Sequence, residues 1–179
     1  MPIPEARIRR GTPDDAPAIA SVRVDTWRSA YRGLLPDALL DGLDTATITA
    51  NWRRGLESID PTRVAYVAEV DGTIVGFATG GRARSANLGY PGEIYALYVR
   101  DPHQGTGIGR ALLRMSVKEL VVRGLAPIVI WTLFANPAAR GFYELLGGAV
   151  IGEKREPFEG YELHEVAYGW LDPAPLVSG

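Results

Sequence analysis

Three glycines in one short loop are the first residues of this sequence whose spacing suggests chemistry. The segment HQGTGIGRAL places Gly105, Gly107 and Gly109 just before a run with helical periodicity. Backbone N–H groups at a helix N-terminus lack partners within the helix, and the helix dipole favours negative charge there. Glycines also let the backbone approach a ligand without a Cβ clash. The loop therefore predicts a phosphate-binding site, with a glycine-rich turn that binds nothing as the alternative.

Two common nucleotide-binding motifs do not fit this loop. A Walker A motif ends in Gly-Lys-Ser/Thr, whereas Arg110 and Ala111 follow Gly109 here. The dinucleotide fingerprint needs G-x-G-x-x-G spacing and an acidic residue at the end of the next strand, and both are missing. Binding of ATP or NAD through the loop is therefore the weaker interpretation.

Two motifs in order carry a resemblance to a known family. The pattern Gln104-x-x-Gly107-x-Gly109, preceded by a strand ending in LYVRDP, resembles the central acyl-CoA motif of the GNAT superfamily of N-acetyltransferases. Further along, NPAARGFYELLG, which starts at Asn136 and contains Tyr143, resembles the second family motif, Asn-x-x-Ala-x-x-x-Tyr-x-x-x-Gly. The two motifs cover roughly residues 92 to 148. The resemblance implies that the loop holds the pyrophosphate of acetyl-CoA, the co-substrate.

The resemblance also implies which residues bind that co-substrate. Two family strands splay apart, and the pantetheine arm pairs with one of them like an added strand, between the glycine loop and the second motif. Carried onto this sequence, the implied cofactor-binding residues are Leu97, Tyr98, Val99, Gln104, Gly105, Thr106, Gly107, Ile108, Gly109, Arg110, Asn136 and Tyr143.

Transfer of an acetyl group to an amine needs a neutral amine, an oxyanion donor and a proton for the leaving thiolate. By resemblance, Tyr143 is the acid, Glu93 is a base that works through water, and the Val99 N–H meets the oxyanion. His103 and His164 are less favoured bases, because one is expected to face solvent and the other to pair within a late strand. A non-catalytic acyl-CoA-binding or regulatory domain is the rival; it would lack this acid and base.

The acceptor is expected to be a primary amine, with a small molecule preferred over a protein N-terminus or lysine. Trp27, Tyr31 and Tyr95 are the expected walls of its pocket. The glutamates of the last hairpin are expected to be a solvated turn, with attraction of a cationic acceptor as the alternative; they are Glu153, Glu156, Glu159 and Glu162. No His, Cys or carboxylate cluster suggests a metal.

The elements that must position these residues alternate in type. Apolar periodicity and turn signals predict strands near residue 8, at 63–70, 73–80, 93–99, 127–134, 149–155 and 161–170, and helices at 12–31, 36–57 (in two pieces), 107–123 and 136–147. This order predicts a mixed α/β (α+β) fold. The GNAT resemblance implies a mostly antiparallel sheet of about seven strands, flanked by about four helices, with strands 4 and 5 splayed.

Composition sets the remaining expectations. The chain has 179 residues, a net charge of −2, no cysteine and no long apolar run. We expect one domain over residues 1–171 and a flexible tail over 172–179, rich in proline. A disulfide or a Cys nucleophile is excluded, and the charge gives no pull toward nucleic acid. We further expect a cytoplasmic protein without a signal peptide and without membrane contact. The resemblance implies a homodimer as an alternative to a monomer.

Overall fold

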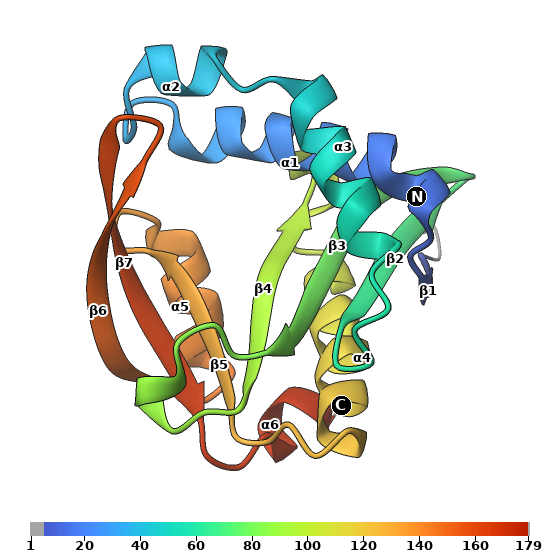
Figure 1. Cartoon of the computed structure of the whole chain (residues 1–179), viewed down its shortest axis with the longest axis vertical. Helices are drawn as coiled ribbons and strands as arrows, with labels where there is room; N and C mark the ends of the chain where they lie inside the picture. The colour runs from blue at the N-terminus through green and yellow to red at the C-terminus, as the bar shows by residue number, and fades with distance from the viewer. Residues whose placement is uncertain (1–5, 179) are drawn as a thin grey trace.

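The computed structural model describes residues 6–178 and consists of one sheet with helices on both faces (Figure 1). Its seven strands follow the spatial order β1-β2-β3-β4-β5-β7-β6. They are β1 (Arg7–Arg10), β2 (Val64–Val70), β3 (Thr73–Arg82), β4 (Gly92–Val99), β5 (Ile128–Leu133), β6 (Ala149–Phe158) and β7 (Tyr161–Trp170). Neighbours pair antiparallel except for β4 and β5. The expected mixed, mostly antiparallel fold is confirmed.

The helices divide between the two faces of the sheet. They are α1 (Ala16–Tyr31), α2 (Asp37–Asp41), α3 (Thr45–Leu56), α4 (Ile108–Val122), α5 (Pro137–Leu145) and α6 (Ala174–Val177). Side chains of α1 and α3 pack with Phe77 and Tyr98 on one face, whereas α4, α5 and α6 pack on the other. We call these the α1 face and the α4 face.

Local chemistry explains the turn between β2 and β3. Asp71 and Gly72 both have positive φ, at 48° and 76°, as a type I′ turn requires. The Asp-Gly pair predicted this hairpin. Strand β3 pairs with β2 along one edge and with β4 along the other, so β4 lies in the centre of the sheet.

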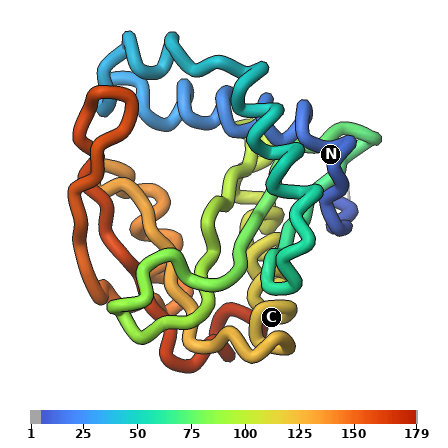
Figure 2. The backbone as a smooth tube through the Cα atoms, in the orientation of Figure 1, coloured from blue at the N-terminus to red at the C-terminus, as the bar shows by residue number. Residues whose placement is uncertain are grey.

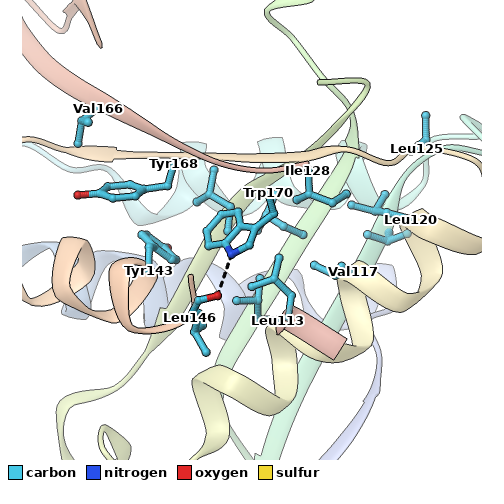
Figure 3. Packing of buried hydrophobic residues seen from close by; sticks show 14 residues of the cluster. Leu113, Val117, Leu120, Leu125, Ile128, Tyr143, Leu146, Val166, Tyr168 and Trp170 are labelled. Atoms are coloured by element: carbon cyan, nitrogen blue, oxygen red, sulfur yellow. Dashed lines mark hydrogen bonds between the residues drawn. The ribbon is translucent and has the colours of Figure 1, made fainter. Parts of the chain in front are cut away.

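The largest core cluster lies on the α4 face (Figure 3). Leu113 and Val117 of α4 meet Tyr143 and Leu146 of α5 against the sheet, and the Trp170 indole N–H donates to the Leu146 carbonyl at 2.9 Å. This packing holds α4 and α5, which carry the two sequence motifs, at fixed positions on one face.

The C-terminal segment expected as a flexible tail contains the short helix α6. Its Leu176 is only 2% exposed and belongs to the same core cluster. The end of the chain turns back beside α4, as the tube in Figure 2 shows, where the Ser178 carbonyl accepts from Arg110. Residues 1–5 and 179, the ends of the expected domain and tail, lie outside the described residues.

Candidate functional site

The central feature of the site is the place where β4 and β5 part. The two strands pair only over Gly92–Ile94 and Ile128–Ile130. The first three residues of β4 are buried, whereas the next five, Tyr95–Val99, are each partly exposed. An extra residue, Tyr95, falls between the β3 partners of Ile94 and Ala96, so a β-bulge bends the strand where the splay begins. Half of a central strand is thus left with an open edge.

The glycine loop lies directly after this open edge. Gly107 is the N-cap of α4 with a φ of 89°, and no side chain caps the helix. Among residues 6–178, no backbone carbonyl accepts from the N–H groups of Gly107, Ile108, Gly109 or Arg110. Four donors therefore point out of one helix end, which favours an anion there.

Side-chain hydrogen bonds hold the loop in place on one side, and open space lies on the other. The Gln104 side-chain amide donates to the Val99 carbonyl at 2.9 Å, and the Thr106 hydroxyl donates to the His103 carbonyl at 2.6 Å. A Cβ built on Gly105 or Gly107 would meet nothing within 4 Å. A depression of about 210 Å³, which Arg110 helps to line, opens beside Gly107. Free donors, open space and a nearby cation fit a pyrophosphate group.

Three tyrosines approach one another at the splay. Burial raises the pKa of Tyr143 well above its usual value, and the neighbouring hydroxyls of Tyr98 and Tyr31 raise it further. Among residues 6–178, the Tyr143 hydroxyl makes no hydrogen bond, whereas Tyr98 accepts from the Trp27 indole N–H at 2.9 Å. Tyr143 therefore stays protonated at neutral pH and keeps its proton available.

Asn136 connects α5 to α1. Its side-chain oxygen accepts from the Ala139 N–H at 3.0 Å, so it caps α5, and its amide donates to the Tyr31 hydroxyl at 3.3 Å. Burial raises the pKa of Tyr31, as do nearby Tyr98 and Glu165, while the Asn136 bond lowers it. The structure therefore brings together the predicted residues Trp27, Tyr31, Asn136 and Tyr143.

Glu93 occupies a different environment from the one expected for a base. It is 0% exposed, and its carboxylate accepts from the Arg84 backbone N–H at 2.8 Å, from Nε at 3.0 Å and from Nη2 at 2.5 Å. Both oxygens are thus engaged by one arginine, which continues over the Tyr95 ring at 4.9 Å. The Tyr95 hydroxyl donates to the Arg82 carbonyl at 2.5 Å, so it braces the β3–β4 connection.

Within the described part of the chain, the two histidines contact other groups than the three tyrosines. His103 is in the turn before the glycine loop, where its N–H donates to the Arg100 carbonyl. His164 stacks on Phe134 at 4.5 Å and contacts Glu153 at 2.8 Å. The remaining expected cofactor residues, Leu97, Val99 and Ile108, pack in one cluster between β4 and α4.

Sequence reasoning named only Glu156 of a group on the α1 face of β5, β6 and β7, and missed Trp131, Lys154 and Glu165. The Lys154 ammonium lies 4.5 Å above the Trp131 ring and contacts both Glu156 and Glu165. No motif marks these residues; only the register of the three strands joins them. Within residues 6–178 no helix is long and apolar enough to cross a membrane, and no three His or acidic side chains are grouped to hold a metal.

Comparisons with known proteins agree with this geometry. The profile of the Acetyltransferase (GNAT) family matches residues 24–147. The chain is 32% identical over 173 residues to the uncharacterized N-acetyltransferase YuaI of Bacillus subtilis (strain 168), with 96% of each protein covered.

Solved structures share the fold at lower identity. The yncA protein of Salmonella typhimurium, solved with its cofactor acetyl-CoA, aligns with a TM-score of 0.69 at 23% identity, covering 94% of this chain and 95% of that one. The PaiA N-acetyltransferase of Thermoplasma acidophilum, in complex with coenzyme A, gives 0.66 at 17%, covering 93% and 99%. Since the family profile spans more than half of the sequence and a relative matches nearly end to end, the chain belongs to the GNAT family of N-acetyltransferases, which are acyltransferases.

Proposed function

We propose that this acyltransferase moves an acetyl group from acetyl-CoA to a primary amine by direct attack, with a small-molecule acceptor preferred. The observation that carries the proposal is the junction of the splayed β4 edge with four unpaired N–H groups and the protonated Tyr143. With no cysteine in the chain, a Cys-linked acyl-enzyme is excluded. The amine therefore attacks the thioester in a ternary complex.

The open edge and the loop have separate tasks in this proposal. Backbone groups of Leu97 and Val99 pair with the pantetheine arm, because β5 leaves that part of β4 free. The N–H groups of Gly107 to Arg110 hold the pyrophosphate. Bound acetyl-CoA supplies the activated acetyl group and a thiolate leaving group. The Val99 N–H is our candidate donor to the oxyanion.

Tyr143 donates a proton to the departing sulfur. A simple thiol has a pKa of about 8.5 and a free tyrosine of about 10. Because burial raises the pKa of Tyr143, its proton is never lost at neutral pH. Its hydroxyl has no hydrogen-bond partner among residues 6–178, so donation breaks no internal bond.

The assignment of Glu93 as the base remains a prediction, and the contact with Arg84 weakens that assignment. Both oxygens of this carboxylate already accept hydrogen bonds from Arg84, so few of its acceptor positions are left for a water. We propose that the Arg84–Glu93 pair fixes the β3–β4 connection beside the splay, and that the amine loses its proton to solvent. A non-catalytic acyl-CoA-binding domain would keep the loop but would not need Tyr143.

Thermal unfolding with added ligand tests the first step. Acetyl-CoA at 100 times its Kd adds about 2.7 kcal/mol, which raises Tm by roughly 5–10 °C for a chain of this size. ATP and NAD serve as controls and are expected to give no shift. A shift with ATP or NAD alone would contradict the proposal. Thiol release with a panel of primary amines then tests transfer, and acetyl-CoA binding without release from any amine would favour the non-catalytic rival.

A further inference from the structure

Two arginines line the depression at the start of α4. Its volume is about 210 Å³, and its lining comes from Gly107, Arg110, Ala111 and Arg114. Among the residues that the structure describes, no acidic side chain lines it, although the whole chain has a net charge of −2. Two positive charges therefore face one open space, which favours an anion there.

Helical spacing brings the two guanidinium groups to the same side of α4. Arg110 and Arg114 are four residues apart, so they share a face and are separated by about 6 Å along the helix axis. Side chains of a helix lean toward its N-terminus, which here carries the unpaired N–H groups of residues 107–110. Like charges at this spacing repel each other. An anion beside both arginines would relieve that repulsion.

The present contact of Arg110 uses little of its hydrogen-bonding capacity. A guanidinium group carries five N–H donors. Among residues 6–178, the Arg110 side chain makes one hydrogen bond, from Nη2 to the Ser178 carbonyl at 3.3 Å. Charge-assisted hydrogen bonds to phosphate are shorter, at about 2.7–2.9 Å, and stronger than bonds to a neutral carbonyl. A phosphate group in the depression would therefore displace the Ser178 carbonyl.

We propose that the side chains of Arg110 and Arg114 bind a second phosphate of the co-substrate, the 3′-phosphate of its ribose. The inference rests on the proposed function, in which the N–H groups of Gly107 to Arg110 hold the pyrophosphate. In coenzyme A both phosphate groups are attached to one ribose, so the second lies within one sugar of the first. The two side chains thus distinguish coenzyme A from its 3′-dephospho form.

Two matched co-substrates test this subsite. We would titrate the protein calorimetrically with acetyl-CoA and with acetyl-3′-dephospho-CoA, which has a hydroxyl group in place of the phosphate. The wild type should prefer acetyl-CoA by about tenfold, and the preference should decrease with added salt. Arg110→Met and Arg114→Met should each lower the preference to about threefold by weakening acetyl-CoA alone, because the backbone N–H groups remain.

Lys118→Met is the control for net charge. Lys118 is an exposed cation of α4, one turn beyond Arg114 and outside the lining of the depression. Its loss should leave the tenfold preference in place. A decrease as large as that in Arg114→Met would overturn the subsite, because the effect would then follow from charge and not from position. Thermal melts confirm that each variant is folded.

The remaining outcomes separate this inference from the proposed function. Equal affinity of the wild type for both co-substrates overturns the subsite, as does an equal weakening of both in Arg110→Met, which would assign that side chain to the pyrophosphate. Equal affinity together with thiol release by a primary amine would sink the subsite alone. A preference for acetyl-CoA without thiol release by any amine would instead contradict the proposed transfer and keep the subsite. Binding of neither co-substrate would overturn both.

Discussion

At the scale of single residues, Tyr143 and Glu93 show how burial gives two polar groups opposite properties. Tyr143 is buried without a hydrogen-bond partner among residues 6–178. Its hydroxyl therefore keeps its proton and does not donate it to another group of the protein. Glu93 is buried and accepts three hydrogen bonds from Arg84, so both of its oxygens already have donors. Both residues were predicted as catalytic from a motif position, which reports where a side chain lies and not what it contacts.

Tyr143→Phe should lower kcat by about 100-fold, as expected for loss of a general acid, and leave acetyl-CoA binding nearly unchanged. Since the hydroxyl makes no bond within the described chain, the free energy of unfolding should change by less than about 1 kcal/mol. Steady-state thiol release and urea unfolding measure the two effects. Because burial raises the pKa of Tyr143, the wild-type rate should show no loss from its ionisation below pH 10.

Tyr168→Phe is the matched control for this variant. Tyr168 packs against Tyr143 in the same cluster, but its hydroxyl donates to Glu144 at 2.6 Å and accepts from Arg140 at 3.1 Å. Its loss should cost about 1–2 kcal/mol of stability and leave kcat intact. If Tyr143→Phe kept full activity with a good amine, Tyr143 would not be the acid.

The Arg84–Glu93 pair should respond unequally to removal of its two members. The Arg84 side chain is 61% exposed and can return to water, whereas that of Glu93 is 1% exposed. Arg84→Met therefore leaves a charge buried and should cost about 3–5 kcal/mol at pH 8; Glu93→Gln should cost less.

The base assignment of Glu93 has its own test. If Glu93 were the base, Glu93→Gln would lower kcat by about 100-fold. We expect kcat to stay close to the wild-type value, and a loss on that scale would restore the base assignment.

At the scale of elements, the glycine loop and α4 form one anion site in our proposal. The free N–H donors lie at the N-terminus of α4, and Gly107 before it has a backbone conformation that favours glycine. Gly107 and Gly160 make this testable, since their φ values are 89° and 80° and a Cβ at either would meet nothing within 4 Å. Gly107 precedes α4, whereas Gly160 lies in the β6–β7 turn. An alanine at either position should therefore cause a similar backbone strain, and the two variants differ only in what surrounds the new methyl group.

Gly107→Ala and Gly160→Ala should each lose about 1–2 kcal/mol of stability from left-handed strain. Only Gly107→Ala should weaken acetyl-CoA, by about tenfold or more, since its methyl group projects into the space proposed for the pyrophosphate. Calorimetric titration with acetyl-CoA and chemical unfolding provide the two readouts. Equal, unchanged affinity in both variants would place the pyrophosphate elsewhere.

Local signals predicted these elements well, and contacts distant in sequence were harder. Asp71-Gly72 and the glycines before α4 act within a few residues, so their backbone conformations could be predicted from the sequence. The Trp131–Lys154 contact depends on β7 lying between β5 and β6, an order that periodicity does not encode. Pairing of Glu93 depends likewise on the path of the β3–β4 connection. The site's motifs were therefore predictable, while its electrostatics required the fold.

At the scale of the whole molecule, the C-terminal segment completes the core behind the site. The proline-rich composition of this segment predicts a loose tail. In the structure, however, one of its apolar side chains packs into the core. Leu176 belongs to the core cluster that α4 and α5 share, and Arg110, in the first turn of α4, donates to the Ser178 carbonyl at 3.3 Å. The last turn of the chain therefore supports the two helices that carry both motifs.

Leu176→Ala should lower the free energy of unfolding by about 2–4 kcal/mol, since it removes a buried side chain and leaves a cavity. For a chain of this size, Tm should fall by roughly 5–15 °C, which calorimetry measures directly. Leu171→Ala is the control, because Leu171 is 76% exposed and its loss should change stability by less than about 0.5 kcal/mol. Equal and small effects would mean that residues 172–178 are the loose tail that composition predicted. A large effect confined to Leu176, with acetyl-CoA restoring part of the lost Tm, would show that the segment is part of the domain.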